Sequence, residues 1–273
     1  MTTTVPALAT RGLDKSFGSL VVAKGIELTL PQGVRYALIG PNGAGKTTLI
    51  NLMTGMLRPD GGGIFLGERD ISTLAPEQRV KQGLVRTFQI NTLFAHLNAL
   101  EAVTLAVCER RGVAGEFWRK LPAYREAVEE AYAILGQLML AKDCYRLTRE
   151  LAYGQQRLLE IALALATRPK VLLLDEPAAG VPRDESAELF TAIANLSSDI
   201  TVLFIEHDMN LVFRFASRII VMVGGRILVE GTPQEIAADP RVREVYLGGA
   251  HGVPHESMIP KSGNRFSEQD HAP

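Results

Sequence analysis

The segment VRYALIGPNGAGKTT, at residues 34–48, decides the fold of this chain. Residues 40–47 fit the pattern GxxxxGK(S/T), in which a glycine-rich loop joins a strand to a helix and surrounds phosphate with backbone N–H groups. The apolar run Tyr36–Ile39 predicts the strand, and Thr48–Met53 predicts the helix. Such a loop needs glycine because a Cβ would block close approach or forbid a positive φ. The segment therefore predicts a nucleoside triphosphate site in an α/β protein.

Two side chains of this phosphate loop have expected roles of their own. Lys46 is expected to reach the β- and γ-phosphates, and the Thr47 hydroxyl is expected to help hold Mg²⁺. The predicted nucleotide-binding residues of the loop are Gly40, Pro41, Asn42, Gly43, Ala44, Gly45, Lys46, Thr47 and Thr48.

A second predicted strand carries two carboxylates toward the same site. The run VLLLDEP at residues 171–177 is apolar up to Asp175 and Glu176, as expected of a parallel strand covered on both faces. Ligands of open α/β sheets bind beyond the carboxyl ends of the strands, so both carboxylates should emerge beside the phosphates. We assign Asp175 to the Mg²⁺ side and Glu176 to the attacking water, as general base. The alternative, a helix-cap or surface pair, is disfavoured by the phosphate loop, and hydrolysis is favoured over binding alone.

The composition is that of a soluble globular protein. The 273 residues are 47% hydrophobic and 22% charged, and the net charge of −1 argues against a broadly basic nucleic-acid binder. Cys108 and Cys144 stand far apart without a CxxC pattern, which fits a reducing compartment and gives no support for a zinc site. No apolar run approaches the ~20 residues of a membrane span, and the N-terminus lacks the features of a secretory signal. We expect a cytosolic chain that reaches a membrane only through a partner.

A second glycine-bearing segment indicates the class of phosphate-loop protein. The segment LAYGQQ at residues 151–156 is predicted to form a loop just before a helical pattern, with the acidic strand following it. In this position it resembles the signature motif of ABC-transporter ATPases, and the resemblance runs from about Leu13 to about Gly249. It implies the ABC ATPase fold, which is an α/β P-loop NTPase (RecA-like) core sheet with an inserted helical subdomain.

The resemblance implies roles for further residues, which occur in family order. Phe17 resembles the aromatic residue that stacks on adenine, Gln89 the Q-loop glutamine that contacts Mg²⁺ or water, and His207 the switch histidine that contacts the γ-phosphate. From the residues alone, Phe17 fits a core position equally well, Gln89 a surface amide and His207 a strand-end histidine. The signature residues that the resemblance places against nucleotide are Leu151, Ala152, Tyr153, Gly154 and Gln155.

The finer resemblance is to the ATP-binding subunit of branched-chain amino-acid ABC importers. It is carried by RTFQ (86–89), LAYGQQRLLEIALAL (151–165), LLLDEPAAG (172–180) and VEGTPQEI (229–236). Urea importers and importers of other polar amino acids or amides use similar subunits, so the cargo stays open. The chain departs from the family pattern at Ala152, where serine is usual, at Tyr153, where glycine is usual, and at Pro182, where the D-loop aspartate is usual. These departures concern communication between two nucleotide sites.

The resemblance also implies cofactors and partners. The cofactors are ATP and Mg²⁺, bound between two ABC ATPase subunits that close head to tail as a homodimer or heterodimer. The other partners are transmembrane permease subunits, facing Gln89 and the helical insertion, and indirectly a solute-binding protein, with no nucleic acid. The expected location is cytoplasmic, peripheral on the cytoplasmic face of the inner (plasma) membrane.

The predicted organisation is one ABC ATPase domain at residues 1–249 and a tail without fixed structure at 250–273. Its core is about 1–91 and 155–249, with residues up to about 91 and about 155–217 expected to form one sheet, and about 92–154 is a helical insertion. Within the insertion, apolar positions spaced by four and three predict a packing seam, with a docking surface for a membrane subunit as the alternative. The seam positions are Phe117, Leu121, Tyr124, Val128, Ala131, Leu135 and Leu138. Residues 219–229 predict a hairpin turning at Gly224 and Gly225, and residues 232–235 predict a helix capping box.

Three other functions compete with that of an importer ATPase. A soluble ABC protein acting on ribosomes or DNA is disfavoured because neither paired nucleotide units nor a long coiled-coil insertion is visible in the sequence. A regulatory module that holds ATP without turnover is conceivable from Ala152 and Pro182, but Glu176 and His207 argue against it. A GTPase is disfavoured because the sequence contains no NKxD tetrapeptide.

Overall fold

The chain folds into two β-sheets and surrounding helices in a computed structural model that describes residues 5–87, 95–113 and 121–247. The strands are β1 (Leu8–Phe17), β2 (Leu20–Leu30), β3 (Arg35–Ile39), β4 (Gly61–Leu66), β5 (Arg69–Asp70), β6 (Leu84–Arg86), β7 (Val171–Asp175), β8 (Thr201–Ile205), β9 (Arg218–Val223) and β10 (Arg226–Gly231). The helices are α1 (Lys46–Thr54), α2 (Pro76–Gln82), α3 (Ala99–Arg110), α4 (Leu121–Gln137), α5 (Tyr153–Ala166), α6 (Arg183–Ala194), α7 (Met209–Phe215), α8 (Pro233–Ala238) and α9 (Pro240–Leu247), with 3₁₀ turns η2 (Ala141–Asp143) and η3 (Thr148–Glu150).

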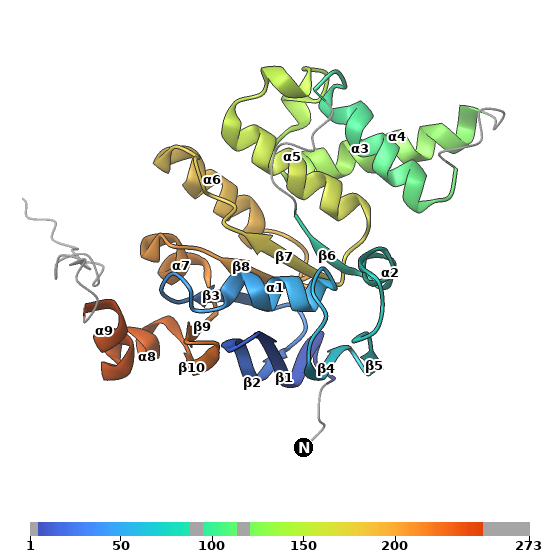
Figure 1. Cartoon of the computed structure of the whole chain (residues 1–273). Helices are drawn as coiled ribbons and strands as arrows, with labels where there is room; N and C mark the ends of the chain where they lie inside the picture. The colour runs from blue at the N-terminus through green and yellow to red at the C-terminus, as the bar shows by residue number, and fades with distance from the viewer. Residues whose placement is uncertain (1–4, 88–94, 114–120, 248–273) are drawn as a thin grey trace, which may run out of the picture.

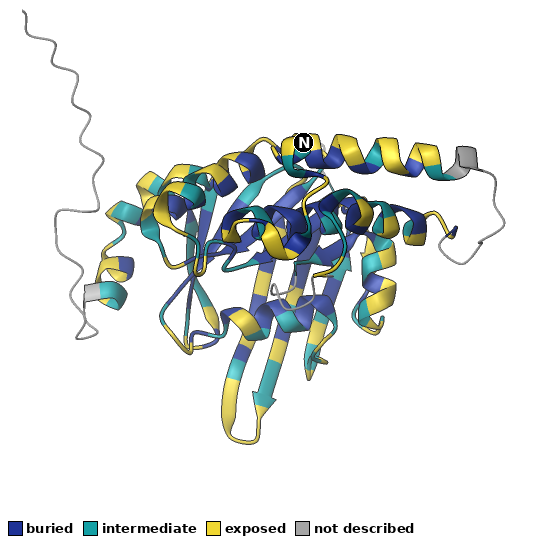
Figure 2. Cartoon of the chain, turned by 90° about the horizontal axis from the view of Figure 1, so that it is seen from above, coloured by how far each residue is buried: buried dark blue, intermediate teal, exposed yellow. Residues whose placement is uncertain are grey.

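The larger sheet contains the strands predicted on either side of the phosphate site. Its order is β10-β9-β3-β8-β7-β6, and all neighbours are parallel except β9 and β10. The predicted strands at 36–39 and 171–175 are confirmed as β3 and β7, and β8 lies between them. These strands are buried almost throughout, because other layers of the molecule cover both faces of the sheet. Figure 2 shows this as dark blue strands beneath helices whose outward faces are yellow.

Alternate residues of the parallel strands fill two separate cores. Along β7, Leu172 and Leu174 belong to one core, and Leu173 belongs to the other, as the period of two requires. The first core is completed by apolar residues of α3 to α9. The second is completed by α1 and by strands β1, β2 and β4. The parallel sheet therefore lies between a helical layer and a layer made of α1 and antiparallel strands (Figure 1).

The prediction of one sheet was wrong. Strands β1, β2, β4 and β5 form a separate antiparallel sheet in the order β2-β1-β4-β5. Only two residues, Gly18 and Ser19, join β1 to β2, and so short a connection permits antiparallel pairing but not a parallel crossover. One face of these strands packs on the second core and the other meets solvent, which gives their mixed burial pattern.

Helices α3, α4 and α5 gather at the end of the molecule opposite the antiparallel sheet (Figure 1). The predicted seam is confirmed at Ala131, Leu135 and Leu138, which are buried. The seam prediction was wrong at Val128, which is 38% exposed. The helix face that contains Ala127 packs on the core instead. Apolar residues spaced by four and three can lie on either of two adjacent faces of a helix. The spacing alone therefore does not tell which face packs on the core. Phe117 lies outside the described residues, and the domain boundaries stay predictions.

The C-terminal predictions are confirmed as far as the structure describes the chain. Strands β9 and β10 form the hairpin, with positive φ at Gly224 and Gly225. Thr232 caps α8, since its hydroxyl accepts from the backbone N–H of Glu235 and its own N–H donates to the Glu235 carboxylate. The predicted tail at 250–273 lies outside the described residues. Within residues 5–87, 95–113 and 121–247, no helix has the length and apolar character that crossing a membrane requires.

Candidate functional site

Strands β3, β8 and β7 are parallel neighbours, so their carboxyl ends meet at one edge of the sheet. In register, Leu38 of β3 lies beside Ile205 of β8, and Ile205 lies beside Asp175 of β7. The phosphate loop, the pair Asp175 and Glu176, and His207 therefore leave the sheet at adjacent points. This edge is where ligands bind in open α/β sheets.

The phosphate loop has the backbone that its glycines permit. Gly45 lies at φ 100° and ends the loop as the N-cap of α1. A Cβ at Gly45 would lie 2.5 Å from the carbonyl oxygen of Val22 in β2, and a Cβ at Gly40 would overlap the carbonyl of Met222 in β9. Both positions therefore require glycine, because backbone carbonyls of β2 and β9 come too close to allow a side chain. The loop thus contacts one strand of each sheet.

Lys46 folds back over the loop that precedes it. Its Nζ donates to the carbonyl oxygens of Gly40 at 2.7 Å and Pro41 at 3.1 Å. The side chain is buried, and burial lowers the pKa of Lys46, while the nearby carboxylates of Glu176 and Asp175 raise it. The ammonium group thus lies inside the loop, within electrostatic reach of both carboxylates.

Two C-terminal elements brace the phosphate loop, and sequence reasoning had given them no role there. The N–H of Gly225, in the β9–β10 turn, donates to the carbonyl of Ala44 at 3.0 Å. The phenol of Tyr246 in α9 lies against the backbone of Gly40, and burial raises the pKa of Tyr246 to about 12. Neither contact has a local sequence signal, because each joins segments about two hundred residues apart.

Asp175 is paired with an arginine that the sequence analysis did not single out. The guanidinium of Arg86, at the end of β6, contacts Asp175 Oδ2 at 2.6 Å and Asn51 Oδ1 at 2.7 Å. Asn51 lies on α1, so Arg86 ties the carboxyl end of β7 to the helix that follows the phosphate loop. Adjacent strands β6 and β7 bring these two residues together.

Glu176 and His207 form the central pair of the site. His207 Nε2 lies 2.8 Å from Glu176 Oε1, and both side chains are about half exposed. Glu176 has a φ of 51°, which is uncommon for a residue with a side chain. A carboxylate and an imidazole in contact beside a phosphate loop can together orient a water molecule and accept its proton.

Glu206 is a further residue of this edge that sequence reasoning missed as a functional group. It is buried, and its two carboxylate oxygens accept from the backbone N–H groups of Ala178 and His207. Burial raises its pKa, and the charge of Glu176 adds to that increase, while the two N–H bonds act in the opposite direction. Its position directly before His207, at the end of an apolar strand, was the available signal.

The signature segment forms the start of a helix rather than a loop. Helix α5 begins at Tyr153, because the Gln155 side chain accepts from the N–H of Ala152 and caps that end. The N–H of Gly154 donates to a carboxylate oxygen of Glu185 at 3.0 Å. Within the part of the chain that the structure describes, no hydrogen bond joins residues 151–155 to the phosphate loop.

The departures from the family pattern make contacts of their own. Arg157 stacks on the ring of Tyr153 and reaches the carbonyl of Ala179, in the turn after Glu176. A Cβ at Gly180, in the same turn, would lie 3.2 Å from the Tyr153 hydroxyl. Tyr153 therefore packs the signature helix against the turn that follows β7.

Two further predicted site residues, Phe17 and Gln89, are not among the side chains that meet at the sheet edge in the described structure. Phe17 ends β1 with its side chain 52% exposed, so it is not a core residue, and Lys15 lies 5.5 Å above its ring. Gln89, predicted as a catalytic and metal-binding residue, lies outside the described residues.

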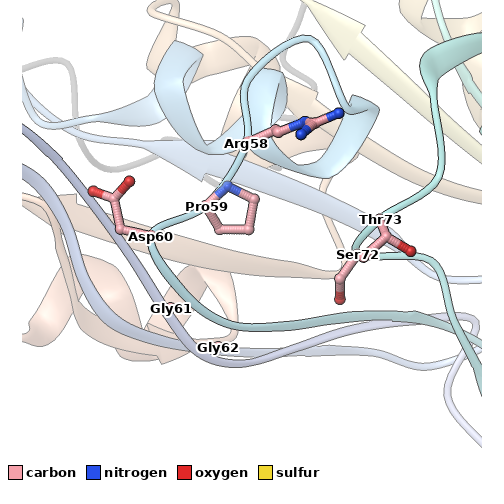
Figure 3. Close-up of a pocket in the computed structure, with 7 residues that line it drawn as sticks. All are labelled: Arg58, Pro59, Asp60, Gly61, Gly62, Ser72 and Thr73. Carbon is pink, nitrogen blue, oxygen red and sulfur yellow. The ribbon is translucent and has the colours of Figure 1, made fainter.

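A surface pocket is formed by residues that follow α1 in the chain, and Figure 3 shows the side chains that line it. Asp60 in this pocket is held by Lys15 and by the N–H of Ser16, so it is tied to β1 of the antiparallel sheet. The pocket is lined by Arg58, Pro59, Asp60, Gly61, Gly62, Ser72 and Thr73. It carries none of the predicted site residues.

Comparison with known proteins identifies the family. A family model described as ABC transporter matches residues 23–179, which is more than half of the chain. The chain belongs to the ABC transporter family. A second family model, described as branched-chain amino acid ATP-binding cassette transporter, matches residues 226–252 of this ABC protein.

Curated relatives and solved structures agree with that family. The chain is 42% identical over 254 residues to the high-affinity branched-chain amino acid transport ATP-binding protein BraF of Pseudomonas aeruginosa, covering 90% of this chain and 99% of the relative. It is 41% identical over 254 residues to the corresponding protein LivG of Escherichia coli K12, with the same coverage. A solved ATP-binding cassette of an ABC transporter in its ADP conformation matches with a TM-score of 0.78 and 33% identity, covering 90% of this chain and 100% of that one.

These comparisons confirm the predicted family resemblance, the ABC ATPase fold and the class of ATP-hydrolysing transport ATPase. Nucleotide binding belongs to this family. The roles of individual site residues stay predictions.

Proposed function

We propose that this ABC protein hydrolyses ATP to drive import of branched-chain amino acids, or related small polar solutes, through separate transmembrane permease subunits. The observation that carries the proposal is the meeting of Lys46, Asp175 and the Glu176–His207 pair at one sheet edge. The names of the relatives and the match at residues 226–252 support the cargo class.

The phosphate loop fits a triphosphate. Glycines occupy the loop positions at which a Cβ would clash with neighbouring backbone, and the loop ends at the N-terminus of α1. Lys46 supplies an ammonium group to the same loop. On nucleotide binding, Lys46 would exchange its carbonyl partners for phosphate oxygens. We propose Phe17 as the adenine platform, because its exposed ring lies on the hairpin whose second strand touches Gly45.

Thr47 and Asp175 are the proposed Mg²⁺ ligands, together with Gln89. Hydroxyl and carboxylate oxygens suit this hard cation, which is bound through few protein groups beside substrate phosphates. When bound, Mg²⁺ offsets negative charge on the phosphates. The contact with Arg86 holds the Asp175 carboxylate in a fixed orientation toward α1 and the loop.

Glu176 is the proposed general base, and His207 orients it. With Nε2 protonated, His207 donates to one carboxylate oxygen of Glu176 and leaves the other for the attacking water. The proton of that water then passes to Glu176, and Lys46 stabilises the negative charge that develops on the phosphate. When the terminal phosphate is bound, the His207 N–H can move from Glu176 to a phosphate oxygen.

A second ABC ATPase subunit, identical or related, completes the site in this proposal. Its segment 151–155 would face the terminal phosphate across the subunit boundary, with the Gly154 N–H as donor. The pair would dock on permease subunits at the cytoplasmic face of the membrane, through Gln89 and the helical insertion, and a solute-binding protein would deliver the cargo.

The test combines turnover with identification of the partners. We expect the purified chain to hydrolyse ATP and Lys46→Ala to lose ATP affinity by at least tenfold. Pull-down from native membranes should recover permease subunits, and vesicles containing them should take up leucine when ATP is supplied. Uptake of urea instead of leucine would contradict the proposed cargo class. Recovery of ribosomes or DNA without a permease would contradict the transport function.

A further inference from the structure

Glu176 has a backbone that requires support. Its φ of 51° falls in the left-handed region, which residues other than glycine rarely adopt. Its N–H donates to the carbonyl of Ile205 at 3.0 Å, and its own carbonyl accepts from Ala179 at 3.0 Å. The turn that carries Glu176 is therefore tied directly to the end of β8.

Glu206 adds a side-chain tie between the same two turns. Its Oε1 accepts from the N–H of Ala178 at 2.8 Å, in the turn after β7, and its Oε2 accepts from the N–H of His207 at 3.1 Å. One carboxylate thus holds both turns that carry the paired side chains. Those side chains, Glu176 and His207, meet at 2.8 Å.

A carboxylate is the side chain that suits this position. Two N–H donors face it, and only a carboxylate offers two acceptor oxygens at this length, whereas glutamine would place an NH₂ group against one of the donors. The charge is costly there: Glu206 is 6% exposed, and within the described chain no lysine or arginine forms an ion pair with it. Burying such a charge beside Glu176 weakens the fold, so its presence here favours a role in the site over a role in stability.

We propose that Glu206 is a positioning residue for ATP hydrolysis, which sets the distance between Glu176 and His207 by holding the backbone of both turns. The inference rests on the roles proposed above for Glu176 and His207. Glu206 itself is buried and each of its oxygens is bonded to a backbone N–H group, so we assign it no direct contact with the attacking water or the phosphate. Its loss should therefore affect the chemical step and leave nucleotide binding in place.

The first test is the Glu206→Gln variant of the full chain, with turnover and ATP affinity measured separately. We expect kcat to fall by at least tenfold and the Kd for ATP, measured with a fluorescent ATP analogue, to change by less than twofold. The matched control is Glu130→Gln, which removes a carboxylate bonded to arginines of α3 and of the segment after α5, far from both turns. That control should lose stability and keep its kcat at a temperature where it is folded.

A second variant keeps the test decisive if Glu206→Gln does not fold. Glu206→Asp keeps the charge but is one methylene too short to span both N–H groups, so we expect the same loss of kcat at unchanged ATP affinity. In a His207→Ala background the effect of either Glu206 variant on single-turnover hydrolysis should shrink to below threefold, since there is no longer a pair to align.

Three results would overturn the inference. They are a kcat within threefold of the parent, a loss of ATP affinity in proportion to kcat, and an undiminished effect in the His207→Ala background. A parent chain that does not hydrolyse ATP would instead contradict the proposed function, so the two failures are distinguishable.

Discussion

The N–H of Gly154 and the carboxylate of Glu185 are joined by a hydrogen bond of 3.0 Å, which links the first turn of α5 to the first turn of α6. A negative group at this place is stabilised by the free N–H groups and the dipole of α5. In the proposed pair of subunits, the same N–H would serve the terminal phosphate of the neighbour's nucleotide. One donor cannot serve both anions, so Glu185 has to release Gly154 when the subunits close.

We therefore predict that Glu185→Ala lowers the ATP concentration needed to pair two subunits. The background is Glu176→Gln, which holds ATP, and the expected shift is about tenfold, the size of one charge-assisted hydrogen bond. Light scattering after size-exclusion chromatography at graded ATP measures it. Asp184→Ala is the control, because Asp184 is an exposed acid in the same helical turn and does not contact Gly154. A higher ATP requirement in Glu185→Ala than in the control would refute the competition.

Glu176→Gln should separate binding from hydrolysis. The amide keeps the size of the side chain but cannot take a proton from water, so turnover should fall by about 10² to 10⁴-fold. ATP affinity should stay within about twofold of the parent, since the phosphate loop is untouched. Phosphate release and equilibrium nucleotide binding measure the two effects, and near-normal turnover would remove Glu176 as the base.

Gly45→Ala should destabilise the protein through a backbone clash. The new Cβ would lie 2.5 Å from the Val22 carbonyl at a φ of 100°, so we expect the free energy of unfolding to fall by about 2–4 kcal/mol. Gly67→Ala, with a φ of 61° and no atom within 4 Å of its Cβ, isolates the conformational part at about 1 kcal/mol. Urea denaturation compares them. Equal losses would mean that the approach of β2 does not constrain the loop.

Glu130 should make the stability of the helical region depend on pH. Its bonds to Arg110, Arg111 and Arg168 lower the pKa of this carboxyl from 4.5 to about 2, with the Arg110 bond as the largest cause. A depressed folded-state pKa stabilises the protein above pH 4.5, and that stability is lost as the pH falls toward 2. Glu130→Gln should thus cost on the order of 2–3 kcal/mol at pH 7 and nothing near pH 2.

The measurement is urea denaturation of parent and variant at pH 7, 4 and 3. The difference between the two proteins should narrow as the pH falls. A difference that is constant with pH would mean that the arginine contacts do not favour the charged form of Glu130.

The sequence predicted those parts of the fold and site that local patterns encode. The phosphate loop, strands β3 and β7, and the β9–β10 hairpin were all visible as runs of apolar residues and glycines. The second sheet was missed because strand pairing depends on partners distant in sequence, such as Leu8 with Leu66.

Long-range contacts also explain the site residues that were missed. Arg86 meets Asp175 only because β6 and β7 are neighbours in the sheet, and Tyr246 meets Gly40 only because α9 folds back on the loop. Glu206 precedes His207 in the sequence but received no predicted role, since burial and hydrogen-bond partners are properties of the folded chain. Val128 was misplaced because two adjacent helical rows share one spacing pattern.

The carbonyl oxygens of Gly40 and Pro41 hold the ammonium group of Lys46 within the phosphate loop. A buried ammonium without partners would force the loop to open or the lysine to discharge, whereas here the main chain satisfies it. In the proposed function, a triphosphate would therefore meet a loop whose backbone Lys46 already supports. Its binding would need an exchange of acceptors at one nitrogen atom rather than refolding of the loop.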